Sequence, residues 1–189
     1  MFKQVKMGRR RSRTITRTFR IQREWDDILD KEAERQGISV NLLVNRILRK
    51  YALFTRWAES AGFQSFTPQM FKKILEELPE DSLASLGATA GASNVIDILN
   101  IMGRPLTYES FIELVVEYFG GNDFCRWFNC FHHVQKNQHV FHLQHNLGRK
   151  WSIYLQEYLL SALSSITKLT AETKIYDFAI NLKVSQTSY

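Results

Sequence analysis

Apolar and polar residues alternate from Thr14 to Ile21, in the segment T-I-T-R-T-F-R-I. A period of two is typical of a β-strand with one apolar face, so a strand is predicted here. Its apolar face carries Ile15, Phe19 and Ile21, and Arg17 interrupts it. Its polar face carries Thr14, Thr16, Thr18 and Arg20.

The period changes to that of a helix directly after this segment. Apolar residues recur at helical spacing over residues 23–35 and again from Val40 to Tyr51. Gly37 lies between the two stretches, as a glycine often does just beyond a helix C-terminus. Ser39 is a residue type that caps the start of a helix. The sequence therefore predicts strand, helix, turn and helix.

Such a unit, about 40 residues long, buries too little apolar surface to be stable alone. Its single strand also leaves both edges without hydrogen-bond partners. A twofold dimer solves both problems, because the two strands pair antiparallel and the four helices share one core. The polar strand faces then form a two-stranded ribbon that fits the major groove of double-stranded DNA.

Strand, helix, G-I-S-V-N and helix together resemble the ribbon-helix-helix family of dimeric DNA-binding proteins, the Arc, MetJ and CopG group, over residues 14–54. The segment F-R-I-Q-R-E-W is similar to the family's strand-to-helix entry, although Gln22 stands where a proline is often found. The resemblance implies base contacts from Thr16, Thr18 and Arg20. It implies phosphate contacts from the start of the second helix, at Ser39, Val40 and Asn41. A helix N-terminus is also an anion site on physical grounds alone.

Charge is distributed unevenly along the chain. Residues 1–56 carry 15 Lys and Arg against 6 Asp and Glu, whereas residues 57–189 carry 10 against 13. This concentration of positive charge indicates a polyanion-binding end, and a solubilising basic tail is the plainer alternative. Residues 1–13 are interpreted as a basic arm onto DNA phosphates or into the minor groove. Its candidate phosphate contacts are Arg9, Arg10, Arg11 and Arg13.

The C-terminal part is predicted to be a separate α+β domain over residues 62–189. Helices are expected from Thr67-Pro68, around residues 95–102, and from Thr107, since threonine caps helix starts. The small residues 86–93 indicate either a loop or a close helix contact. Strands are then expected at 126–135 and 138–146, a helix at 148–166, and one last strand whose apolar face carries Tyr176, Phe178, Ile180, Leu182 and Val184. The predicted order is thus three helices, then strand, strand, helix, strand.

All five histidines lie in the predicted hairpin, within residues 131–145. With the turn at residues 136–137, facing residues have numbers that sum to 273. The diagonal neighbours are then His132 with His139 and His133 with His142. A metal site that includes Cys130 is one interpretation, and a polar sheet face or interface is the commoner one. No spacing matches a tight ligand motif, so neither a metal nor a cofactor is predicted.

Other classes of function receive little support. No apolar run approaches the roughly 20 residues of a membrane-spanning helix. The basic N-terminus is not followed by the apolar core of a secretory signal. Only two cysteines occur, Cys125 and Cys130, so a reduced cytoplasmic protein is expected. No nucleophile elbow, P-loop, zinc-protease motif or kinase signature is present, so an enzyme is not predicted.

These patterns predict a homodimeric transcriptional regulator, or a higher oligomer, that binds double-stranded DNA sequence-specifically. The C-terminal domain is expected to add oligomerisation or sensing of a small effector. One alternative is an antitoxin or plasmid-maintenance protein, which also uses this fold. Another is a metal- or ligand-responsive regulator that uses the C-terminal domain. A protein-interaction or ligand-binding module with an incidental basic arm is a third.

Overall fold

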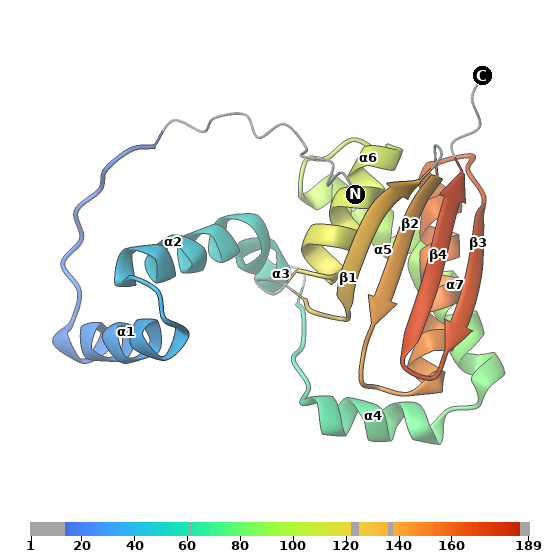
Figure 1. Ribbon diagram of the computed structural model, residues 1–189, viewed down its shortest axis with the longest axis horizontal. Coiled ribbons are helices and arrows are strands. Elements are labelled where there is room, and N and C mark those ends of the chain that lie inside the picture. Colours follow the sequence, from blue (N-terminus) through green and yellow to red (C-terminus); the bar gives the residue numbers. More distant parts are fainter. Residues whose placement is uncertain (1–13, 61, 122–124, 136–137, 186–189) are drawn as a thin grey trace. The chain divides into compact units, whose positions relative to one another are not determined.

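The computed structural model describes residues 14–60, 62–121, 125–135 and 138–185. The chain divides into two compact units, Met1–Ala58 and Glu59–Tyr189 (Figure 1). We call them unit 1 and unit 2. Within the described residues, no helix is both long enough and apolar enough to cross a membrane. The molecule is mixed helix and sheet, so the predicted α+β class is confirmed at this level.

Unit 1 is helical beyond an extended N-terminal segment. Helix α1 spans Arg23–Gln36 and α2 spans Val40–Lys50. A short π-helix, Tyr51–Thr55, then leads without a break into α3, Arg56–Ser60. Gly37 closes α1 in the left-handed conformation (φ 65°), which glycine adopts without steric cost. Both predicted helices of this unit are therefore present.

Unit 2 places helices on one face of a four-stranded antiparallel sheet. Its helices are α4 (Pro68–Glu77), α5 (Glu80–Ile101), α6 (Tyr108–Glu113), a π-helix (Leu114–Phe119) and α7 (Arg149–Ile166). Its strands are β1 (Asn129–Gln135), β2 (Gln138–Gln144), β3 (Ala171–Tyr176) and β4 (Ala179–Ser185), in the order β1-β2-β4-β3. Figure 1 shows α5 and α7 behind this sheet. The core lies between them and the inward side chains of β2 and β4.

Hydrophobic period and helix caps predicted most of unit 2 correctly. Thr67 accepts a hydrogen bond from the Met70 backbone N–H at 3.3 Å, and Thr107 does the same for Ser110. The predicted hairpin has the expected register, since Cys130 faces Leu143 and every other pair also sums to 273. Period, cap and turn are local signals, and here all three agree with the fold.

The prediction of a single last strand was wrong. This part of the chain forms a hairpin, β3 and β4, with Asp177 and Phe178 at the turn. Ile180 and its alternate neighbours on β4 are buried, as predicted, whereas Tyr176 and Phe178 are exposed. An uninterrupted apolar alternation concealed the turn, because Asp177-Phe178 lacks the Asn-Gly or Asp-Gly signal of a two-residue hairpin loop.

Residues 86–93 form a close helix contact, not a loop. They lie inside α5, where Gly87 and Gly91 face α7. A Cβ atom at Gly87 would lie 2.4 Å from the Tyr154 carbonyl oxygen, and one at Gly91 would lie 2.2 Å from the Tyr158 carbonyl oxygen. The Ser161 hydroxyl donates to the Ala88 carbonyl oxygen at 2.6 Å in the same contact. Glycine is therefore required here by the approach of two backbones.

We predict that Gly91→Ala destabilises unit 2. Alanine would favour the helical state by about 1 kcal/mol over glycine. The added methyl group meets the backbone of Tyr158, however, and overpacking of this kind costs about 1–3 kcal/mol or more. Urea denaturation of the intact protein measures the difference. Ser85→Ala, at an exposed position of the same helix, is the matched control and should leave stability nearly unchanged. A Gly91→Ala variant at least as stable as the wild type would contradict the close contact.

Candidate nucleic-acid interface

The predicted base-contacting residues lie in an extended segment ahead of α1. Residues 14–22 have no helical or strand pairing among the described residues, and Thr16, Thr18 and Arg20 are all exposed. Gln22, the residue that caps α1, has the extended angles φ −69° and ψ 142°. A strand acquires its ladder hydrogen bonds only from a neighbouring strand. The ribbon that the resemblance implies needs a second chain, and it is not present in this single chain.

The predicted phosphate-contacting residues lie together at the start of α2. The Ser39 hydroxyl oxygen accepts a hydrogen bond from the Leu42 backbone N–H at 3.2 Å, as an N-cap residue does. Asn41 is exposed one turn before Asn45, whose side-chain amide donates to the Asn41 carbonyl oxygen at 2.8 Å. Val40 is half-buried. The cap uses only one of the free amides at this helix end, so the others remain available to an anion.

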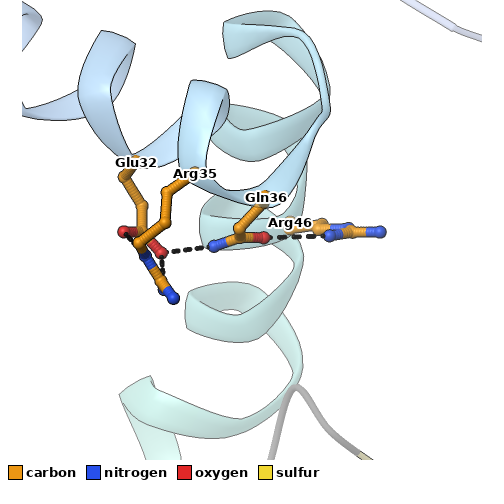
Figure 2. Close-up of polar contacts among 4 residues, drawn as sticks. All are labelled: Glu32, Arg35, Gln36 and Arg46. Carbon is orange, nitrogen blue, oxygen red and sulfur yellow. Dashed lines mark hydrogen bonds and ion pairs between the residues drawn. The ribbon is translucent and has the colours of Figure 1, made fainter.

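A polar network that the sequence analysis did not predict joins the end of α1 to α2 (Figure 2). The Arg35 guanidinium donates to both carboxylate oxygens of Glu32, at 2.7 and 2.5 Å. The Gln36 amide donates to Glu32 at 2.5 Å and accepts from Arg46 of α2 at 3.3 Å. Hydrogen bonds from Arg35 and Gln36 lower the pKa of Glu32 to about 2. Glu32 precedes Arg35 by three residues and Gln36 by four, so all three lie on one side of a helix. This spacing is the sequence signal that could have predicted the network.

The two helices of unit 1 carry opposite charge. All six acidic residues of residues 1–56 lie on α1, whereas α2 carries Arg46, Arg49 and Lys50 and no acid. Arg17, Arg20 and Arg23 are exposed in and next to the extended segment. Positive charge therefore gathers on the extended segment and α2. The candidate arm residues Arg9, Arg10, Arg11 and Arg13 lie outside the described residues.

Unit 1 leaves most of its large apolar side chains exposed. Within α1 and α2 only Ala33 and Leu43 are buried. Phe19 is 65% exposed and Ile28 63%. The other large exposed apolar side chains of unit 1 are Ile15, Ile21, Trp25, Leu42, Ile47, Leu48, Tyr51 and Leu53. So many exposed apolar side chains in one small unit are typical of a protein–protein interface.

Comparisons with known proteins identify no relative. No protein-family model, curated protein or solved structure matches this chain.

The histidine hairpin brings together the pairs expected from its register. On the helix-covered face, His132 Nε2 lies 3.0 Å from His139 Nδ1, a hydrogen-bond distance. The ring centroids are 5.1 Å apart, which exceeds the nitrogen separation by 2.1 Å, about twice the radius of an imidazole ring. The two nitrogens therefore face each other, and one ring donates a hydrogen bond to the other. Within the described residues, no group of three or more His, Cys, Asp or Glu could hold a metal.

The second histidine pair lies on the opposite face of the sheet. His133 and His142 stack with ring centroids 5.5 Å apart. His142 Nδ1 lies 2.8 Å from the side-chain amide oxygen Oδ1 of Asn181 on β4, so this nitrogen carries the proton and donates it. These contacts match the interpretation of a polar sheet face. Cys130 is half-buried, and burial raises the pKa of its thiol to about 12, which keeps it protonated near neutral pH.

The buried Ser152 and the half-buried His145 also meet, in a series of hydrogen bonds that does not activate the serine as a nucleophile. The Ser152 hydroxyl donates to the Tyr176 carbonyl oxygen at 2.6 Å. His145 Nε2, 2.9 Å away, must therefore donate to the Ser152 oxygen, while His145 Nδ1 accepts from the Leu147 N–H. A catalytic base would have to accept the serine proton at Nε2. These hydrogen bonds instead join the end of β2 to α7 and to the β3–β4 turn.

We predict that unit 2 loses stability as the pH falls from 6.5 to 5. Burial lowers the pKa of His132 to about 4, with further lowering by His139 and His133, and burial lowers the pKa of His145 to about 4. The unfolded chain, with ordinary histidines near 6.5, binds more protons in this window, so stability rises with pH there and is lost as the pH falls towards the folded pKa. Urea denaturation across this range measures the slope.

His132→Gln and His145→Gln should each reduce that slope, and the double variant should reduce it further. The window lies above the range in which ordinary carboxylates titrate, so Asp and Glu contribute little to it. A double variant with the slope of the wild type would show that these histidines do not carry the effect.

Proposed function

We propose that this protein is a homodimeric, sequence-specific double-stranded DNA-binding protein of the ribbon-helix-helix type, acting as a transcriptional regulator. The observation that carries the proposal is the exposed apolar surface of unit 1 beside an extended segment with no strand partner among the described residues. A second copy of the chain would cover the exposed apolar side chains and provide the extended segment with a strand partner. The two extended segments would pair antiparallel, and Phe19, Ile28 and their apolar neighbours would enter a shared core.

Pairing of residues 14–22 would set the direction of the polar side chains. With Ile15, Phe19 and Ile21 turned into the dimer core, Thr16, Thr18 and Arg20 would point outward on both strands. Arginine makes a bidentate contact with guanine, and threonine hydrogen-bonds bases or touches a thymine methyl group. The ribbon is the proposed source of sequence preference.

Affinity would come mainly from phosphate contacts. The amides at the start of α2, near Ser39 and Asn41, offer donors at the positive end of the helix dipole. Arg17, Arg23 and the N-terminal arginines would add counterion release, which makes binding steeply salt-dependent. The proposed activity is binding, not catalysis, and the proposed location is the cytoplasm.

We predict that Ile28→Lys prevents dimerisation without unfolding α1. Ile28 is exposed in the single chain, so a lysine is tolerated there. In the dimer core it would be an unpaired buried charge, costing several kcal/mol and weakening association on the order of 100-fold or more. Analytical ultracentrifugation over a concentration series measures the dissociation constant.

Asp30→Lys is the matched control for this experiment. Two residues turn the helix by about 200°, so Asp30 lies on the other side of α1 and is also exposed. This variant should remain dimeric. A monomeric wild-type protein, or an Ile28→Lys variant that dimerises as well as the wild type, would refute the shared core.

We predict that two substitutions separate sequence preference from affinity. Arg20→Ala should lose about 1–3 kcal/mol of preference for the selected site over random duplexes. Ser39→Asp keeps an N-cap oxygen but sets a negative charge against the phosphate, so it should weaken binding to all duplexes alike. Binding titrations over a salt series, with a duplex selected from a random pool, measure both effects.

Lys72→Ala is the control for net charge, because Lys72 is an exposed residue of α4 in unit 2. It removes one positive charge, as Arg20→Ala does, and should leave DNA binding nearly unchanged. The proposal would be refuted if the protein binds every duplex weakly and neither Arg20→Ala nor Ser39→Asp changes this binding.

A further inference from the structure

Two buried polar atoms on α7 have no hydrogen-bond partner in the described part of the chain: Trp151 Nε1 and Tyr158 Oη. Trp151 is 4% exposed and Tyr158 0%. They are seven residues apart, about two helical turns, and therefore lie on the same face of α7. Buried N–H and O–H groups are nearly always paired, because leaving one unpaired costs folding free energy. Two such groups on one face call for a hydrogen-bonding group that the described residues do not supply.

Aromatic rings from other elements surround these two residues. The Trp127 ring lies edge-on to both, with centroids 5.7 Å from Trp151 and 5.3 Å from Tyr158. Trp127 in turn stacks on Phe119 at 4.5 Å with nearly parallel planes. Phe71 of α4 packs edge-on against Trp151 at 5.2 Å. The two orphan donors are thus set in an apolar, aromatic surface, which is the usual composition of a small-molecule site.

Trp127 is the one ring of those just named that no helix or strand carries, and its backbone N–H donates to the Phe119 carbonyl oxygen at 2.8 Å. It is half-buried and lies in the irregular segment before β1. Arg126, just before it, has φ 51°, a conformation that few residues other than glycine adopt. Such strained residues gather at ligand clamps and switches. Tyr154 also touches both Trp151 and Tyr158, but its backbone is fixed on α7 against Gly87.

We propose that Trp151 and Tyr158 form the floor of a binding site for a small, neutral, planar aromatic molecule with one hydrogen-bond acceptor, which takes the place of the Trp127 indole. The acceptor pairs with the Trp151 N–H and the Tyr158 O–H. The ring of the ligand stacks on Phe119, where the indole of Trp127 now lies. A charged ligand is excluded, since no charged side chain is part of this cluster and burial of an unpaired charge is costly.

The site lies wholly within unit 2, and its test is small-molecule binding. Failure of DNA binding in unit 1 therefore leaves this inference standing, and failure of ligand binding leaves the DNA-binding proposal standing. The two inferences rest on different residues and are measured separately.

The test compares acetophenone with α-methylstyrene, two molecules of similar size that differ at the carbon attached to the ring, which is doubly bonded to oxygen in the first and to CH₂ in the second. Binding to the full-length protein is followed by ligand-observed NMR at millimolar concentrations. Acetophenone should bind about tenfold more tightly or better, as expected for two recovered hydrogen bonds of about 0.5–1.5 kcal/mol each. Equal binding of the two, or no binding of acetophenone, would overturn the proposal.

Tyr158→Phe provides the decisive variant, because it removes the hydroxyl group and keeps the ring. It should lower acetophenone affinity several-fold, part of the way to that of α-methylstyrene, because the Trp151 N–H still pairs with the acceptor, while the melting temperature of the ligand-free protein stays the same or rises. Trp127→Ala should bind acetophenone more tightly than the wild type, since no indole must leave. Tyr176→Phe, at an exposed tyrosine, is the control. A Tyr158→Phe variant that melts lower and binds acetophenone normally would show that the hydroxyl has an internal structural role instead.

Discussion

Unit 2 depends on the approach of two helix backbones at Gly87 and Gly91. Because α5 carries no Cβ at these positions, the carbonyl oxygens of Tyr154 and Tyr158 on α7 come within the space that a methyl group would fill. This contact fixes the height and rotation of α7 against α5. The inward face of α7, with Leu155 and Leu159 fully buried, is thereby held against the sheet, and Tyr158 is held in the aromatic cluster. The two glycines thus determine the position of α7, and with it the packing of the core and the position of Tyr158 in the proposed ligand site.

Burial of apolar surface is solved differently in the two units. Unit 2 encloses its own core, with Val95, Phe141 and Ile180 all fully buried within one chain. Unit 1 has α1, α2, the short helical turns that follow them and one extended segment, which leave Phe19 and Ile28 exposed. The hydrophobic driving force is the same per unit area in both. The two units differ in the number of helices and strands that cover their apolar side chains. In the proposed dimer, the second copy supplies the additional helices and strand that unit 1 lacks.

Local patterns predicted what local interactions determine. Helix α7, the caps at Thr67 and Thr107 and the register of the β1–β2 hairpin were all predicted correctly from spacing alone. The turn at Asp177-Phe178 was missed because two short strands in succession continue the same alternation. The sequence left two structures open for residues 86–93, because small residues suit a loop and a close helix contact equally. Only the position of α7 distinguishes between them.

The candidate sites show the same limit. Ser39 as an N-cap follows from its place between Gly37 and an apolar stripe, so the start of α2 was predictable. The partnerless state of Trp151 and Tyr158 was not, because a helical stripe of aromatics predicts core and gives no account of their polar atoms. That account requires the neighbours contributed by α4 and the Trp127 segment.

Ionic contacts in unit 1 cannot replace the missing apolar burial. Its network of Glu32, Arg35 and Gln36 is exposed, and exposed ion pairs contribute little to stability because water and salt screen them. The network does hold one arginine against α1, close to the acids of that helix. Arg17 and Arg20 precede α1, and Arg23 is its first residue; all three are exposed, and no acid precedes them in the chain. If apolar surface joins the two copies, the three arginines stay free to contact a polyanion. DNA binding by the paired strands requires this separation between an apolar dimer interface and an exposed basic surface.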